Sequence, residues 1–133
     1  MADYKEIGVI PYYYKNNSYR FVLVTSRKKP SSWIFPKGQP EDERTDREIA
    51  INEAFEEAGV IGTIQGKAIK VTVQEKNRLV LYKLYPFKIS RICQMWPERK
   101  LRRRCFLRPE NALKELRRKP YAQALSLFLD ERR

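Results

Sequence analysis

The sequence predicts an α+β or α/β sandwich in one domain, and three observations favour it. Several runs rich in Val, Ile, Tyr and Phe are bounded by turn residues, which is typical of strands. A stretch in the middle of the chain carries apolar residues at helical spacing, and two stretches near the end open with proline, as helices often do. A chain of 133 residues has the size of a single domain, so we expect residues 1–133 to form one.

Three short strands are expected in the first third of the chain. They cover residues 6–14, 19–26 and 33–35. The turn residues at 16–18 should join the first two strands into a hairpin. Pro11 should weaken the first strand or place it at an edge of the sheet, because proline has no N–H to donate to a neighbouring strand.

A helix over residues 46–58 is predicted by signals at both of its ends. Thr45 and Glu48 fit a capping box, and Gly59 stands where a helix commonly ends on a left-handed residue. Between these signals the apolar residues recur every three or four positions and form one stripe: Ala50, Ile51, Ala54, Phe55 and Ala58. We therefore expect one face of this helix to pack on the sheet.

The second half of the chain predicts more strands and then two helices. Strands are expected at residues 60–64, 67–74, 78–89 and 102–107, with a loop at 90–101. Helices are expected at residues 109–119 and 120–132. Strands on both sides of a helix, followed by terminal helices, indicate the sandwich stated above.

Composition excludes several classes of site. The chain contains no histidine, which excludes Ser-His-Asp and Cys-His nucleophiles and zinc sites that use histidine. Its net charge is +12, with −1 in residues 1–59 and +13 in residues 60–133, so we expect an anionic partner such as a polyphosphate or a nucleic acid. Cys93 and Cys105 are too few for a disulfide framework, and neither a signal peptide nor a membrane span is evident, so we expect a cytoplasmic protein that does not enter membranes.

Three glutamates on the expected central helix carry the chemistry. Glu53, Glu56 and Glu57 fall within about 100° of arc beside the apolar stripe. Carboxylates at this spacing repel one another, and a divalent cation with oxygen ligands would reverse that cost. The alternative is a solvated acidic face, which is common on helices.

The segment from Gly38 to Val60 resembles the signature of the Nudix hydrolases, G-x5-E-x7-R-E-U-x-E-E-x-G-U, where U is a bulky aliphatic residue. Ala54 is small for its position, Arg44 stands where the signature has glutamate, and Asn52 stands where it has arginine. Six of the nine defined positions match: Gly38, Glu53, Glu56, Glu57, Gly59 and Val60. Residues 33–38 are also similar to the segment that leads into this signature in the family.

The resemblance implies a Nudix-like α/β/α sandwich with a mixed central sheet and a loop–helix–loop that binds Mg²⁺ or Mn²⁺. The metal ligands would be Glu53, Glu56 and Glu57, with the backbone carbonyl of Gly38. Family members cleave diphosphates that are linked to a further group. A bound cation favours such a reaction because it neutralises phosphate charge and lowers the pKa of a coordinated water.

The departures from the signature imply lower activity rather than a different fold. In the family the arginine orients the first helix glutamate, and Asn52 offers no charge for that task. Asp42 or Glu43 could replace the acid that is missing at Arg44. The resemblance therefore implies an enzyme whose rate is reduced by these two substitutions.

The general base is left open between several carboxylates. Glu57 and Glu75 are candidates, and Glu98 is preferred because its expected loop could reach the helix. The alternative for Glu98 is an ordinary surface acid that pairs with Arg99 or Lys100.

Basic residues suggest how an anionic substrate is held. If residues 102–107 form a strand, Arg102 and Arg104 share one face and could bind phosphate. Arg27 and Lys37, with Lys28 and Lys29, could add to a positive rim from the loops before the helix. The alternative for all these residues is that they only solubilise the protein.

A narrower resemblance favours one substrate class. Residues 22–27, 33–38 and 96–106 are similar to the diphosphoinositol polyphosphate phosphohydrolases, a subgroup that also hydrolyses diadenosine polyphosphates. RNA whose 5′ end carries a pyrophosphate fits the charge equally well. The alternative function is a Nudix-fold module that binds nucleotides or RNA 5′ ends with little or no turnover. The oligomeric state is left open.

Overall fold

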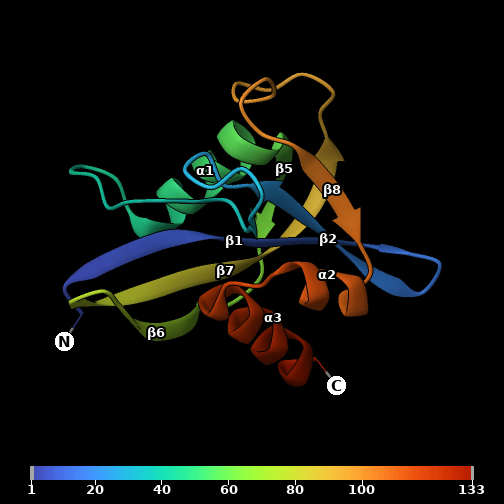
Figure 1. Ribbon diagram of the computed structural model, residues 1–133. Helices are drawn as coiled ribbons and strands as arrows, with labels where there is room; N and C mark the ends of the chain where they lie inside the picture. The colour runs from blue at the N-terminus through green and yellow to red at the C-terminus, as the bar shows by residue number, and fades with distance from the viewer. Residues whose placement is uncertain (1, 133) are drawn as a thin grey trace.

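The computed structural model describes residues 2–132, and within them the strands form one mixed sheet of eight. Strands β3, β2, β1, β7 and β5 lie side by side in that order, while β4 pairs with β1, β6 with β7 and β8 with β2 (Figure 1). The β1–β7 pair is parallel and the other pairs are antiparallel. The strands are β1 (Tyr4–Lys15), β2 (Ser18–Thr25), β3 (Trp33–Ile34), β4 (Lys37–Gly38), β5 (Val60–Ile64), β6 (Ile69–Glu75), β7 (Arg78–Ile92) and β8 (Arg104–Leu107).

Helices cover both faces of this sheet and complete the expected α/β/α sandwich. Helix α1 (Asp46–Ala58) packs on β1, β5 and β4, whereas α2 (Pro109–Glu115) packs on β2 and α3 (Lys119–Glu131) on β6. Figure 1 shows α1 on one side of β1 and α2 with α3 on the other. Within residues 2–132 no helix combines the length and the apolar character needed to cross a membrane.

The local signals around the hairpin and α1 are confirmed. Asn16 and Asn17 both have positive φ (51° and 60°) and join β1 to β2, as a two-residue hairpin turn requires. The Thr45 hydroxyl accepts from the Glu48 N–H at 3.1 Å, and the Glu48 carboxylate accepts from the Thr45 N–H at 2.8 Å. Gly59 ends α1 at φ 65°. Local chemistry alone thus sets both limits of this helix.

The expected edge position of the first strand is wrong, because β1 lies in the middle of the sheet. Pro11 pairs with Phe87 of β7 on one side, but pairing with β2 begins only at Tyr12. The N–H of Val9, two residues before Pro11, points to the side of β1 opposite β7, where it donates to the Pro36 carbonyl at 3.1 Å. Alternate residues point their N–H groups to the same side, so the missing N–H of Pro11 falls where no strand pairs with it.

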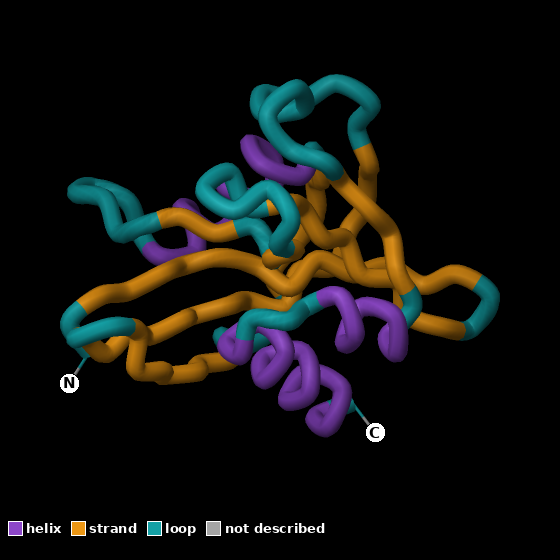
Figure 2. The backbone as a smooth tube through the Cα atoms, viewed as in Figure 1, coloured by secondary structure: helices purple, strands orange, loops and turns teal. Residues whose placement is uncertain are grey.

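Some boundaries also differ from the expected ones. β8 begins at Arg104 rather than Arg102, β7 continues to Ile92, and the two-residue β4 was not expected. α2 ends at Glu115 because Leu116 leaves the helical region (ψ 77°) and is buried in the core. Because β7 ends at Ile92 and β8 begins at Arg104, a loop spans residues 93–103. Figure 2 shows this loop arching over the C-terminal end of α1.

Candidate functional site

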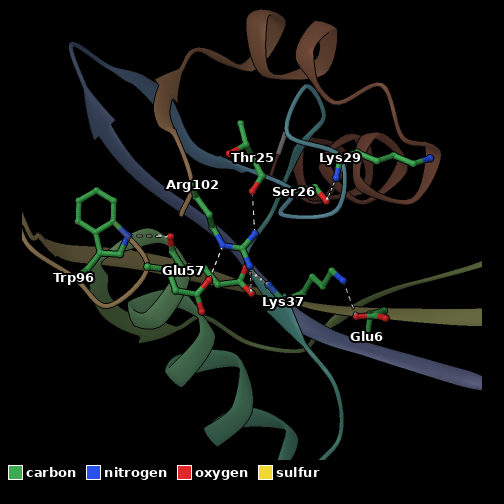
Figure 3. Close-up of polar contacts among 9 residues, drawn as sticks. Glu6, Thr25, Ser26, Lys29, Lys37, Glu57, Trp96 and Arg102 are labelled. Atoms are coloured by element: carbon green, nitrogen blue, oxygen red, sulfur yellow. Dashed lines mark hydrogen bonds and ion pairs between the residues drawn. The ribbon is translucent and has the colours of Figure 1, made fainter. Parts of the chain in front are cut away.

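The last turn of α1 turns the Glu57 side chain into the protein. Glu57 is only 5% exposed, which is unusual for a carboxylate. Its Oε1 accepts a hydrogen bond from the Lys37 N–H at 3.2 Å, and its Oε2 lies 3.1 Å from Nη2 of Arg102 (Figure 3). Strand β4 and the loop 93–103 therefore both hold this carboxylate in place.

Glu53 lies beside Glu57 and against the backbone of Gly38. A Cβ added to Gly38 would lie 2.8 Å from Oε2 of Glu53, so only glycine leaves room for the carboxylate here. Glu53 lies one helical turn before Glu57, on the same side of α1. Two carboxylates at this spacing repel each other unless a proton or a cation compensates their charge.

The pKa values of both carboxylates are raised. Burial raises the pKa of Glu53, the hydrogen bond from Glu57 lowers it, and the charges of Glu98 and Glu56 raise it again. Burial raises the pKa of Glu57 to about 8, although the neighbouring Arg102 lowers it. The raised pKa values indicate that the negative charge of these carboxylates is only partly compensated at this point.

The loop 93–103 brings Glu98 to the same place. The N–H of Glu98 donates to the Glu56 carbonyl at 3.0 Å, and its Oε1 accepts from Nε of Arg102 at 2.8 Å. The partner of Glu98 is thus Arg102 rather than the neighbouring Arg99 or Lys100. Glu75 instead accepts from the Tyr82 hydroxyl at 2.6 Å, and it lines the same cleft as Glu57.

The oxygen atoms of this site suit a hard divalent cation chemically. In residues 2–132 no group of three or more Asp, Glu, Cys or His side chains is arranged to hold an ion as the side chains stand. The Glu53 and Glu57 carboxylates, next to the backbone of Gly38, nevertheless supply the oxygen ligands that Mg²⁺ and Mn²⁺ prefer. A cation would compensate the negative charge of both.

A basic cleft of about 880 Å³ opens beside the carboxylates. Eight of the fourteen residues that line it are Lys or Arg, and three are Glu. The expected residues Arg27, Lys28, Lys29, Lys37 and Arg102 are among them. Sequence reasoning missed Lys76, Arg78 and Arg118, which reach the cleft from the β6–β7 turn and from the segment before α3. Their positions in the chain give no sign of this, because only the sandwich brings those segments together.

Arg102 and Arg104 do not share a strand face as expected, because β8 begins at Arg104. Arg104 is not among the residues that line the cleft. Its Nη1 donates to the carbonyls of Ala58 and Cys93, both at 2.9 Å, and its guanidinium lies 3.8 Å from the Trp96 ring centroid. The geometry therefore ties Arg104 to the C-terminal end of α1.

The two sharper departures from the signature, Arg44 and Asn52, differ in their surroundings. Arg44 is exposed and lies 3.9 Å from Glu41, and Asp42 and Glu43 are exposed on the same loop. Asn52 is half-buried on α1.

Comparisons with known proteins agree with the observed fold. No family model matches the chain. Nudix hydrolase 21, chloroplastic, of Arabidopsis thaliana is 26% identical over 137 residues, which is 98% of this chain and 69% of that protein. Diphosphoinositol polyphosphate phosphohydrolase 3-beta of Bos taurus is 33% identical over 113 residues, which is 80% of this chain and 68% of that protein. The crystal structure of a C. elegans Ap4A hydrolase binary complex matches with a TM-score of 0.79 at 22% identity, over 96% of this chain and 98% of that one.

Proposed function

Because the chain belongs to the Nudix hydrolase family and is a Nudix pyrophosphohydrolase, we propose that it cleaves a phosphoanhydride bond in a highly phosphorylated small molecule. A diphosphoinositol polyphosphate or a dinucleoside polyphosphate is the substrate class we favour. The names of the Bos taurus relative and of the C. elegans structure support this class. The cofactor would be Mg²⁺ or Mn²⁺.

One observation carries the proposal: two carboxylates, the buried Glu57 and the half-buried Glu53, lie beside a strongly basic cleft. Glu53 and Glu57 are short of positive charge, whereas the cleft beside them carries an excess of it. A ligand that brings many negative charges together with a cation satisfies both at once. An apolar substrate would satisfy neither, and a cationic substrate would be repelled by the basic cleft.

The residues take separate roles in this proposal. Glu53, Glu56 and Glu57, with the Gly38 carbonyl, would hold the cation. When bound, the cation would neutralise phosphate charge and lower the pKa of a water molecule. Arg27 and Lys37 would bind substrate phosphates. Glu98 is the preferred base, and Arg102 orients it by donating from Nε to its Oε1.

The location and the extent of the domain belong to the proposal as well. The relatives include chloroplastic and mitochondrial proteins, so a cytoplasmic location stays a prediction. The same holds for the organisation of residues 1–133 as one domain.

The test is a substrate panel with and without each cation. Diphosphoinositol phosphates, diadenosine polyphosphates, ADP-ribose and 5′-triphosphate RNA are each incubated with Mg²⁺, Mn²⁺ or a chelator, and phosphate and nucleotide release are measured. We expect cation-dependent product from a polyphosphate, with kcat reduced by about a hundredfold or more in Glu57→Gln. Glu110→Gln, which removes an exposed carboxylate from α2, is the matched control.

The panel also tests the alternative function. Tight, salt-sensitive binding of RNA 5′ ends or nucleotides, with no product under any cation, would contradict hydrolysis and support a binding module. Slow but cation-dependent turnover agrees with the reduced activity implied by Arg44 and Asn52.

A further inference from the structure

Arg102 joins carboxylates that come from two different elements. Its Nε donates to Oε1 of Glu98 at 2.8 Å, and its Nη2 lies 3.1 Å from Oε2 of Glu57. Glu57 belongs to α1, whereas Glu98 belongs to the loop 93–103. One guanidinium therefore fixes the relative positions of two candidate site carboxylates, as its planar fork is suited to do.

The third nitrogen of Arg102 is engaged as well. Nη1 donates to the Thr25 carbonyl at 2.9 Å, at the end of β2 (Figure 3). The Arg102 side chain is only 9% exposed. A guanidinium whose three nitrogens each have a protein partner, and which is nearly shielded from solvent, has little left to offer a substrate phosphate.

The loop that carries Arg102 is fastened at both of its sides. Next to Arg102, the Arg103 N–H donates to Thr25 Oγ1 at 2.9 Å, and the Thr25 N–H donates to the Arg103 carbonyl at 3.1 Å. Further back in the loop, Trp96 Nε1 donates to the Glu57 carbonyl at 3.1 Å, and the Glu98 N–H donates to the Glu56 carbonyl. Arg102 is therefore delivered to α1 by a rigid segment rather than by a free arm.

These contacts give a burial argument for what Arg102 does. Glu57 is buried and lies one helical turn after a second carboxylate, Glu53, and like charges at this spacing repel each other. Arg102 supplies fixed positive charge on the side of Glu57 that faces the loop. These contacts of Arg102 reach Oε2 of Glu57 and Oε1 of Glu98, and they do not involve Glu53 or the second oxygen of Glu98.

We propose that Arg102 is a positioning residue, which orients Glu57 and Glu98 as one unit for the divalent cation and the attacking water, and that it is not a substrate-binding residue. This inference rests on the proposed function. It predicts that Arg102 acts on turnover and on cation binding, and that it leaves substrate affinity nearly unchanged.

The experiment compares Arg102→Gln and Arg102→Lys with the matched control Arg103→Gln. Arg103 is exposed, and its guanidinium lies 5.2 Å from the Trp33 ring centroid, away from the carboxylates. Isothermal titration calorimetry measures Mn²⁺ and Mg²⁺ binding to the substrate-free proteins, and steady-state kinetics measure kcat and KM. Near-ultraviolet circular dichroism and thermal unfolding check that each variant is folded.

For Arg102→Gln we expect kcat and cation affinity each to fall roughly 10- to 100-fold, with KM within about threefold of wild type. Arg102→Lys keeps one charge and loses the fork, so its losses should be smaller, and Arg103→Gln should behave as wild type. If Arg102→Gln does not fold, Arg102→Lys carries the same comparison.

A double variant tests the connection through Glu98. Combining Arg102→Gln with Glu98→Gln should lower kcat by clearly less than the product of the two single losses, because the two side chains act as one unit. Losses that multiply would overturn this part of the inference.

The outcomes separate this inference from the proposed function. If the wild-type protein binds neither cation, the proposed function fails first. If it binds a cation and turns over substrate, but Arg102→Gln and Arg102→Lys raise KM while kcat and cation affinity stay unchanged, then Arg102 contacts substrate and the positioning role is wrong.

Discussion

At the scale of single residues, the behaviour of the site depends on how Glu57 balances burial against charge. Desolvation by burial raises its pKa to about 8, and the ion pair with Arg102 does not fully offset that burial. A proton and a metal cation therefore compete for the same carboxylate pair. This competition links cation binding, stability and pH.

The raised pKa of Glu57 predicts a pH dependence of stability without cation. Since its ordinary pKa is 4.5, the folded protein keeps a proton that the unfolded chain loses between pH 4.5 and about 8. The stability contributed by Glu57 is thus fully present below pH 4.5 and is lost as pH rises through about 8. We expect the melting temperature, measured in chelator, to fall more over this range in wild type than in Glu57→Gln.

Cation binding should show the complementary trend. The affinity for Mn²⁺ measured by calorimetry should increase with pH up to about 8, because a smaller fraction of the Glu57 carboxyls then carries a proton that the cation must displace. If the melting temperature in chelator falls equally with pH in wild type and in Glu57→Gln, the raised pKa of Glu57 is contradicted.

At the scale of elements, the end of α1 is fastened by residues distant in sequence. The last turn of α1 carries no basic residue of its own, although its carbonyl end has partial negative charge. Arg104 and Trp96 donate to its final carbonyls instead. Gly59 makes this possible, since a Cβ there would lie 2.7 Å from the Trp96 ring.

Two glycines allow the Trp96 contact to be measured separately from backbone strain. Gly59 and Gly66 both have positive φ (65° and 84°), but a Cβ on Gly66 would meet no atom within 4 Å. Gly66→Ala should cost about 1–2 kcal/mol of unfolding free energy from strain alone. Gly59→Ala should cost a further 1–3 kcal/mol, roughly, because the indole must move.

Denaturant unfolding of both variants provides the measurement. Gly59→Ala should also lower kcat, because Trp96 lies in the loop that carries Glu98 and Arg102, whereas Gly66→Ala should not. Equal losses of stability in the two variants would show that the Trp96 contact is readily relieved.

At the scale of the whole molecule, the fold gathers positive charge from separate segments into one cleft. The basic residues that line the cleft come from both halves of the chain. Arg78 and Arg118 belong to the basic half, and four others belong to the nearly neutral half: Arg27, Lys28, Lys29 and Lys37. The local field there is therefore stronger than either half alone would suggest.

This collected charge predicts a salt-dependent KM. The double variant Lys28→Gln/Lys29→Gln should raise KM for a diphosphoinositol or dinucleoside polyphosphate by roughly tenfold at low salt, and it should weaken the increase of KM with ionic strength. The matched control Lys70→Gln/Lys88→Gln removes the same charge from exposed strand positions outside the cleft. Equal changes in both variants would indicate a general charge effect.

Much of the fold could be predicted because its signals are local. The capping box at Thr45, the stop at Gly59 and the Asn16–Asn17 turn depend on neighbours within four residues, and the structure confirms all three. The edge position expected from Pro11 failed because it depends on which strand lies alongside, and that is decided by residues as distant as Phe87.

The sequence by itself determined the sandwich, the limits of α1 and the grouping of Glu53, Glu56 and Glu57, because helix periodicity and capping act over a few residues. Only the tertiary structure decided that Glu57 is buried, that Arg102 pairs it with Glu98, and that Arg104 fastens α1. Burial and ion pairing depend on which distant segments pack together, and the spacing of residues along one chain does not contain that information.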